Sequence, residues 1–237
     1  MNQEEASIDR SAAHGAVLRQ KIRLAEPWLA AVTEEFWNHP DLKQMLPEFF
    51  ARVYASSTSS IEAMRVALER SEVLAARGDS IAAVLATYLE KHIEEEVEHP
   101  EWLLADLAVL GYDEPAVRER FRSAAIASLI GPQLYWIRHV HPLALLGFFA
   151  VLEGLPPTLE HMDEVEERTG YPRSAFRMMR SHATLDLEHA DELFDLLDSL
   201  PLSSDQGSLL AMSSFTTLER VCGVFHEVLQ LRNHGGD

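Results

Sequence analysis

Two short stretches of the sequence, residues 92–99 and 182–189, share the spacing His-x3-(Asp or Glu)-x2-His. In an α-helix each residue advances by about 100°, so the three residues of this pattern fall within roughly 60° of one another. Each stretch therefore presents two imidazoles and one carboxylate on the same side of its helix. Two such sides facing each other would make a metal site with nitrogen and oxygen ligands.

The acids in these stretches have a spacing that suits iron. Di-iron carboxylate proteins take imidazole and carboxylate ligands from Glu-x-x-His pairs on facing helices. Glu96 and His99 have this spacing, and Asp186 and His189 repeat it with the shorter acid. Glu95 points close enough to the same side to replace Glu96 as the ligand. His92 has two interpretations: it binds metal, or it holds a ligand in place through a hydrogen bond.

A two-metal site also needs a carboxylate from a third helix, and Glu153 is the best candidate. It ends the most apolar segment of the chain, residues 134–153, where an unpaired carboxylate would be costly to bury. The alternative is that Glu153 lies on the last turn before Gly154 and reaches solvent. A single His-x3-acid-x2-His pattern is most often a solvated helix surface, so the second copy is what favours metal binding.

The rest of the chain has the pattern of a helical scaffold. Apolar residues recur at helical spacing, and we find no convincing alternation, hairpin dipeptide or glycine-rich phosphate loop. The sequence predicts an all-α protein, with the cluster at residues 56–60 as a turn, a corner at residues 131–132 and a buried central helix at 134–153. The expected helices span residues 14–36 (kinked or divided at Pro27), 42–54, 61–76, 81–99, 101–110, 114–129, 134–153 (with a break allowed at residues 141–142), 158–168, 172–200 and 209–232.

Length and composition limit the class of protein. The chain has 237 residues, of which 47% are hydrophobic, enough for one large core. No boundary favours a division, so we expect a single domain over residues 1–237 with a frayed N-terminus at residues 1–12. Thirty-eight acids against twenty bases give a net charge of −18, which argues against nucleic acid and anionic membranes as partners.

The single cysteine, Cys222, speaks against a disulfide framework and against a thiolate-based zinc or iron–sulfur site. We find no apolar stretch of signal-peptide or membrane-span length. These features predict a soluble, cytoplasmic protein. Its expected partner is a small-molecule substrate, and a homodimer stays open.

The residues around the first motif resemble a known family. The run His92, Ile93, Glu95, Glu96, His99, Trp102, Leu103, Leu104, Asp106, Leu107 and Gly111 resembles the signature of the iron-containing redox enzymes of the haem-oxygenase-like di-iron oxidase superfamily. The second motif resembles that superfamily's second metal-binding helix, and Glu153 lies close to where the family places its central-helix glutamate. The resemblance covers about residues 42–200 and implies a haem-oxygenase-like bundle of about seven core helices.

The resemblance also implies two non-haem iron ions, with the ligands Glu96, His99, Glu153, His182, Asp186 and His189. Several members have Glu-x6-His on the first helix, and His92 occupies that glutamate position here, so Glu95 or Glu96 must supply the carboxylate. Relatives use O2 at iron for oxidative decarboxylation or C–C cleavage of carboxylic or amino acids, N-oxygenation of amines, and p-aminobenzoate assembly. The expected function is therefore that of an O2-activating di-iron oxidase or oxygenase acting on a small organic substrate, with O2 as co-substrate.

Two other functions compete with this one. A metal-free enzyme of the same fold, similar to thiaminase or to quinone-cofactor-synthesis proteins, would not need the six ligand residues. A haem-binding or iron-storing helical protein would need a proximal histidine on its first helix or a cage-forming oligomer, and the sequence signals neither. Trp102 and Asp106 are candidates to brace the first motif. Arg173, Arg177 and Arg180 are candidates to meet a substrate carboxylate, with plain surface charge as their alternative.

Overall fold

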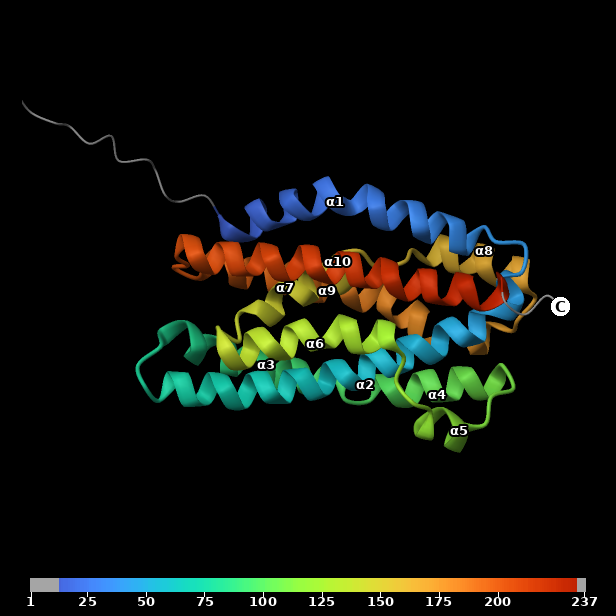
Figure 1. Ribbon diagram of the computed structural model, residues 1–237, viewed down its shortest axis with the longest axis horizontal. Coiled ribbons are helices and arrows are strands. Elements are labelled where there is room, and N and C mark those ends of the chain that lie inside the picture. The colour runs from blue at the N-terminus through green and yellow to red at the C-terminus, as the bar shows by residue number, and fades with distance from the viewer. Residues whose placement is uncertain (1–12, 234–237) are drawn as a thin grey trace, which may run out of the picture.

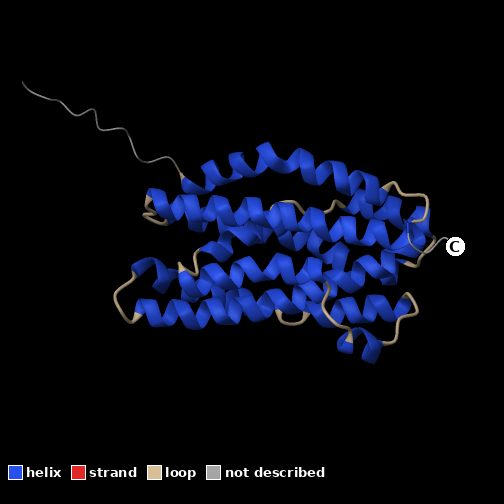
Figure 2. Ribbon diagram, viewed as in Figure 1, coloured by secondary structure: helices blue, strands red, loops and turns tan. Residues whose placement is uncertain are grey.

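The computed structural model describes residues 13–233, and all regular structure in this range is helical, as the sequence predicts (Figures 1 and 2). The expected fraying at residues 1–12 lies outside the described range. Within the described range, no helix combines the length and the apolar character needed to cross a membrane. The elements are α1 (His14–Trp37), α2 (Leu42–Ala75), α3 (Ser80–Glu96), α4 (His99–Val109), α5 (Glu114–Glu119), α6 (Ala124–His139), α7 (Ala144–Leu152), α8 (Leu159–Thr169), the 3-10 turn η1 (Arg173–Ala175), α9 (Arg177–Ser199) and α10 (Ser204–Asn233).

The long helices run along a common axis and enclose the short apolar helix α7 (Figure 1). Helix α2 packs along α3 and α6, whereas α10 packs along α1 and α7. Residues 144–151 of α7 are all buried, as expected for a helix that is apolar on every side. The later part of the segment predicted as the central helix therefore lies in the core and ends at Glu153. Its first part, residues 134–139, belongs instead to α6 and includes the exposed Tyr135.

The turn predicted at residues 56–60 is wrong, because α2 continues through it to Ala75. The hydroxyl groups of Ser59 and Ser60 donate to the carbonyls of Ala55 and Ser56, one turn earlier in the same helix. Hydroxyls bonded in this way do not compete with the helix for its backbone donors. Buried residues on both sides of the cluster, including Tyr54 and Ile61, keep the helix packed along its length.

Two other predicted boundaries are also wrong. The helix predicted at residues 114–129 is divided, because Ser123 caps a new helix by accepting a hydrogen bond from the backbone N–H of Ile126. Residues 131–132 lie inside α6 and form no corner. The allowed break at residues 141–142 is real: His141 Nδ1 accepts from the Leu143 N–H, and its Nε2 lies 3.2 Å from Asp79 Oδ2.

Helix α7 approaches α10 closely at Gly147. A Cβ atom there would lie 2.5 Å from the carbonyl oxygen of Leu210, and Ser214 Oγ already donates to the Gly147 carbonyl over 2.8 Å. We expect Gly147→Ala to lower the free energy of unfolding by about 1–3 kcal/mol, because the added methyl group forces the two helices apart. Chemical denaturation followed by circular dichroism measures this.

Gly223→Ala on α10 is the matched control, since nothing lies within 4 Å of the added Cβ. Alanine is the better helix former, so this change is expected to stabilise the fold by up to about 1 kcal/mol. Equal destabilisation by the two changes would contradict the close approach of α7 and α10.

A group of charged side chains ties α2 to the segment before α6. Glu48 accepts hydrogen bonds from Arg52 Nη1, from both terminal nitrogens of Arg120 and from the Tyr112 hydroxyl. Burial disfavours the charge of Glu48, but the hydrogen bonds from Arg120 and Tyr112 and the positive charge of the two arginines outweigh it. The pKa of Glu48 is lowered to about 2.

This depressed pKa predicts a pH-dependent stabilisation by Glu48. The folded-state pKa of about 2 lies below the ordinary 4.5, so the contribution is complete above pH 4.5 and is lost as the pH falls towards 2. We expect Glu48→Gln to cost about 1–2 kcal/mol at pH 7, allowing for the partial exposure of the carboxylate, and progressively less below pH 4.5. Urea denaturation of both proteins between pH 3 and 7 tests this, and a difference that does not change with pH would contradict it.

Candidate metal centre

Four helices bring the predicted ligand residues to one place in the interior. His92 and Glu96 come from α3, His99 is the first residue of α4, and Glu153 directly follows α7. Helix α9 carries the second motif, His182, Asp186 and His189. All six predicted ligand residues therefore meet, and the contacts given below join them to one another.

The single helix predicted at residues 81–99 is wrong, because α3 ends at Glu96 and α4 begins at His99. Proline has no backbone N–H and disfavours helical backbone in the residue before it, so Pro100 fits the first turn of a new helix and not the interior of an old one. Despite this break, His99 Nδ1 lies 2.7 Å from Glu96 Oε2. His99 therefore lies on α4 and not on α3, but it still pairs with Glu96.

Glu96, His99 and His182 form the first triad. One ligand atom of each lies within 4.8 Å of those of the other two, and His182 Nε2 is 3.1 Å from His99 Nδ1. The other ring nitrogen of His182, Nδ1, is 2.6 Å from Asp186 Oδ1. A carboxylate in this position fixes the tautomer of the imidazole and leaves Nε2 free as a ligand.

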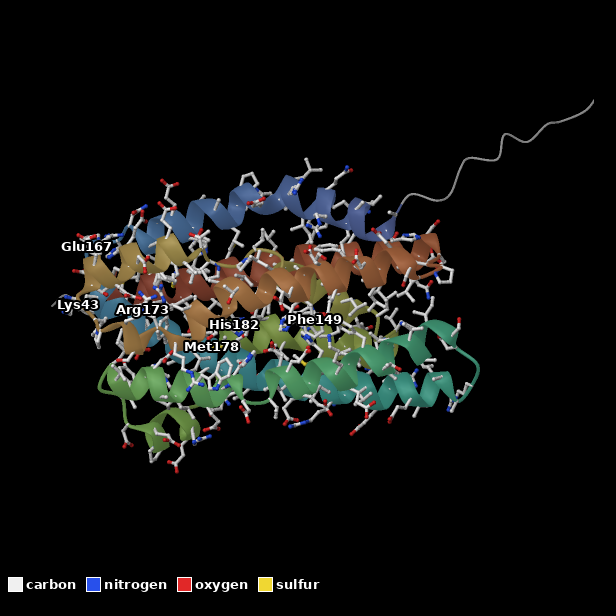
Figure 3. The ribbon with its side chains drawn as sticks, turned by 180° about the vertical axis from the view of Figure 1, so that it is seen from behind. Lys43, Phe149, Glu167, Arg173, Met178 and His182 are labelled. Carbon is white, nitrogen blue, oxygen red and sulfur yellow. The ribbon has the colours of Figure 1, made fainter. Side chains whose placement is uncertain are left out.

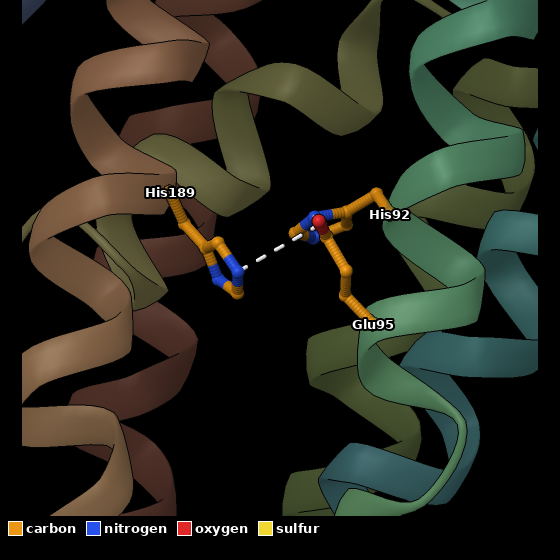
Figure 4. Close-up of side chains that lie close together, drawn as sticks. All are labelled: His92, Glu95 and His189. Carbon is orange, nitrogen blue, oxygen red and sulfur yellow. Dashed lines mark ion pairs between the residues drawn. The ribbon is translucent and has the colours of Figure 1, made fainter.

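His92, Glu95 and His189 form the second triad, in which α3 and α9 face each other (Figure 4). Glu95 Oε2 lies 3.8 Å from His92 Nδ1 and 3.8 Å from His189 Nε2. The sequence left open whether His92 and Glu95 take part, and the structure places both beside His189. The sequence could have indicated both residues, because both lie on the side of α3 that carries the His-x3-Glu-x2-His motif.

Glu153 connects the second triad to α7. Its Oε1 lies 3.1 Å from His92 Nε2, and the residue is only 7% exposed. The alternative that Glu153 reaches solvent is therefore wrong. On the other side, His189 Nδ1 lies 3.7 Å from Glu96 Oε1, so the two triads are contiguous.

Three buried ligand atoms at this centre have no hydrogen-bond partner among the described residues: Glu96 Oε1, Glu153 Oε2 and His189 Nδ1. Leaving such an atom buried and unpaired costs about 1–3 kcal/mol, more for a charged group. Bound metal would satisfy these atoms, because carboxylate oxygens and imidazole nitrogens are both metal ligands. Imidazole and carboxylate donors are a set that iron accepts, so the residues present fit the metal that the sequence suggests.

The pKa shifts at the centre also favour a bound cation. Burial raises the pKa of Glu153, and the nearby carboxylates of Glu96 and Asp186 add to the increase. Burial disfavours charge on His92 and His182 as well, but their bonds to Glu153 and Asp186 outweigh it and raise both histidine pKa values. The centre thus holds several acidic side chains in a buried position, where their negative charge favours a bound cation.

A cavity of about 610 Å³ opens on the centre. Glu96, Glu153, His182 and Asp186 line one part of it. Much of the remaining wall is apolar and includes Phe149 and Met178, which are labelled together with His182 in Figure 3. The cavity has the size and lining of a site for a small organic molecule.

Of the two residues expected to brace the first motif, Trp102 contacts the centre and Asp106 links the helices beside it. The Trp102 ring packs 4.5 Å from that of His99, and Asp106 Oδ2 accepts a hydrogen bond of 2.9 Å from the Met178 N–H in the first turn of α9. Burial raises the pKa of Asp106 to about 6. Asp106 therefore joins α4, which carries His99, to α9, which carries His182.

The three arginines considered for a substrate carboxylate are not among the residues that line the cavity. Arg173 and Arg180 pair with Asp163 and Glu166. The guanidinium of Arg177 lies over the Trp102 ring, 4.6 Å from its centroid. Arg173 lies towards one end of the bundle, away from His182 (Figure 3). The structure thus favours the surface-charge alternative for these residues.

Comparison with solved structures finds similar folds. A domain of unknown function with a heme oxygenase-like fold from Shewanella denitrificans superposes with a TM-score of 0.71 at 17% identity, over 94% of this chain and 93% of that one. A TenA homolog from Pseudomonas syringae superposes with a TM-score of 0.70 at 11% identity, over 92% of this chain and 93% of the other. At such identities the likeness shows the fold, and it confirms the predicted haem-oxygenase-like bundle.

Comparison with curated protein sequences gives no significant match. Residues 62–215, by contrast, match the sequence profile of a family described as iron-containing redox enzymes. This stretch contains both motifs and Glu153, and it confirms the resemblance that the residues around His99 suggested. The chain therefore belongs to the family of iron-containing redox enzymes.

Proposed function

We propose that this protein is an O2-activating non-haem di-iron oxidase or oxygenase that acts on a small organic substrate. The observation that supports it best is the set of three unpaired ligand atoms, on Glu96, Glu153 and His189, buried between two His/Glu triads. Without a bound metal, leaving these three atoms unpaired would destabilise the bundle.

The residues divide naturally between two ions. Glu96, His99 and His182 would hold one, with Asp186 either as a further ligand or as the group that orients His182. His189 and Glu153 would hold the other, with His92 and Glu95 beside them. The predicted set of six ligands is thus retained, and His92 and Glu95 extend it.

Bound iron would supply the electrons for the reduction of O2, which no side chain of this centre can do alone. The chain itself positions the reactants. Its apolar cavity walls, among them Phe148 and Val151, keep bulk water away from the centre. The Glu153 carboxylate fixes the His92 ring, and Trp102 packs against the His99 ring, so that the ligands are held in place before metal binds.

Anaerobic loading with Fe(II) followed by exposure to O2 tests this function. We expect the loaded protein to consume O2 in proportion to its bound iron, and the iron-free protein to consume none. Zinc-loaded protein is the control for metal that cannot change its oxidation state. Failure to bind iron, or an equal lack of O2 consumption by all three samples, would contradict the proposal and favour a metal-free enzyme of this fold.

A further inference from the structure

Glu95 connects the second triad to the surface of the molecule. Its side chain is 35% exposed, whereas those of His92 and His189 are 2% and 10% exposed. The described residues that line the cavity include Glu96 and Glu153 but none of these three. The second triad therefore meets solvent through Glu95, between α3 and α9, and not through the cavity (Figure 4).

A lysine and a second glutamate cover Glu95 at this surface. Lys91, one turn earlier on α3, places its Nζ 3.4 Å from Glu95 Oε1 and 2.5 Å from Glu192 Oε2 on α9. The side chains of Lys91 and Glu192 are both 52% exposed. The two oxygens of Glu95 thus have different neighbours: Oε1 contacts the surface lysine, and Oε2 lies 3.8 Å from His92 Nδ1 and from His189 Nε2.

Oε2 of Glu95 lies further from these histidines than ligand atoms lie from one another around a bound ion. With metal–ligand bonds of about 2.0–2.2 Å, neighbouring ligand atoms are about 3.0–3.4 Å apart. In the first triad His99 Nδ1 lies 2.7 Å from Glu96 Oε2 and 3.1 Å from His182 Nε2. Glu95 must therefore move inward before its carboxylate and the histidines of the second triad can bind the same ion.

Lys91 opposes this inward movement. Its ammonium group holds the outer oxygen of Glu95 and neutralises part of the charge that attracts a metal ion. Being a cation itself, it also repels the incoming ion. Glu192 acts in the opposite sense, because its shorter contact draws Lys91 towards α9 and away from Glu95. The Glu95 carboxylate is thus shared between a surface lysine and a metal ion at the second triad.

We propose that Lys91 is a positioning residue that competes with the second metal ion for the Glu95 carboxylate. The inference rests on the proposed function only for the presence of two metal ions, and O2 chemistry does not enter it. It gives Lys91 and Glu192 a part in metal binding, although neither residue is a ligand. The affinity of the second site then depends on an ion pair at the surface.

Titration of the iron-free protein with Co(II), followed by calorimetry and visible absorption, tests the proposal. Co(II) accepts the same imidazole and carboxylate ligands as Fe(II) and lies next to it in the order of metal affinities. Lys91→Gln should tighten binding of the second ion about fivefold or more, because it frees Glu95 and removes a repelling charge. Lys43→Gln is the matched control, since it makes the same change towards one end of the bundle, away from His182 (Figure 3). It should alter the affinity of neither ion.

Glu192→Gln breaks the same ion pair and should have the opposite effect. Without Glu192, Lys91 pairs with Glu95 alone, so the second ion should bind about threefold more weakly or worse. An ion pair that only stabilises the fold predicts a change in the same direction for both variants. Opposite signs therefore separate a positioning role from a structural one.

A double-mutant cycle with Glu95→Gln shows whether Lys91 acts through Glu95. In the Glu95→Gln protein the second ion loses a ligand. The further change Lys91→Gln should then alter its affinity less than about twofold, because the direct repulsion by an exposed lysine is screened by salt. If Glu95→Gln abolishes binding of the second ion, the signs of the Lys91→Gln and Glu192→Gln effects decide the question.

Three results would overturn the proposal: an unchanged second affinity in Lys91→Gln, changes in the same direction in Lys91→Gln and Glu192→Gln, or an equal gain with and without Glu95. A wild-type protein that binds two Co(II) ions would in these cases keep its two-metal centre and lose only the role of Lys91. A single bound ion in every protein would refute both. The failure of the proposed function and the failure of this inference are therefore distinguishable.

Discussion

Replacing His182 with alanine is expected to lower the bound iron from two ions per chain to one or none. His182 contributes its Nε2 to the first triad, 3.1 Å from His99 Nδ1, and its Nδ1 contacts Asp186 over 2.6 Å. The change removes a ligand and also leaves the Asp186 carboxylate without its partner. Loss of an orienting group alone typically costs 10–100-fold in metal affinity, so loss of the ligand should cost about 100-fold or more.

Iron per chain is measured by elemental analysis after anaerobic loading and desalting, on proteins whose circular dichroism spectra agree. Thr184→Ala serves as the control, because Thr184 lies on the same helix but is exposed and outside both triads. It should retain the wild-type iron content. An unchanged stoichiometry in the His182→Ala protein would remove that residue from the ligand set.

Replacing Glu153 with glutamine is expected to have opposite effects on stability and on iron binding. In the iron-free protein Glu153 is a buried carboxylate with an unpaired Oε2, close to the negative charges of Glu96 and Asp186. A neutral amide removes this repulsion, so the iron-free variant should melt about 2–4 °C higher, equivalent to about 1 kcal/mol. The same change removes an anionic ligand, so bound iron should fall.

Differential scanning calorimetry and iron analysis on the same samples measure both effects. Glu188→Gln on the exposed side of α9 is the matched control and should alter neither quantity. A lower melting temperature for the iron-free Glu153→Gln protein would mean that the carboxylate stabilises the fold through its contact with His92. It would then have a structural role independent of metal.

Much of the fold could be predicted because the strongest signals were local. The uniform apolar character of residues 144–151 placed α7 in the core, and a proline marked the true break before it, at residues 141–142. Local sequence signals gave wrong predictions where tertiary packing determines the structure. The hydroxyl cluster at residues 56–60 has the composition of a turn, but its hydroxyls bond within α2, and neighbours such as Ile61 are buried, which keeps the helix intact.

Most of the candidate centre could be predicted from the sequence, because the spacing of residues along a helix determines on which side of the helix their side chains lie. The six proposed ligand residues do meet, although Pro100 moved His99 to a separate helix. The pairing of His92 with Glu153 and of Glu95 with His189 could not be predicted, since it depends on how α3, α7 and α9 pack.

Mössbauer spectroscopy of protein loaded anaerobically with ⁵⁷Fe(II) and then exposed to air tests the two-metal centre most directly. The contiguous triads, joined by the approach of His189 Nδ1 to Glu96 Oε1 at 3.7 Å, predict two irons per chain that are magnetically coupled after oxidation. A spectrum of isolated ferric ions, or one iron per chain at saturation, would contradict the di-iron centre.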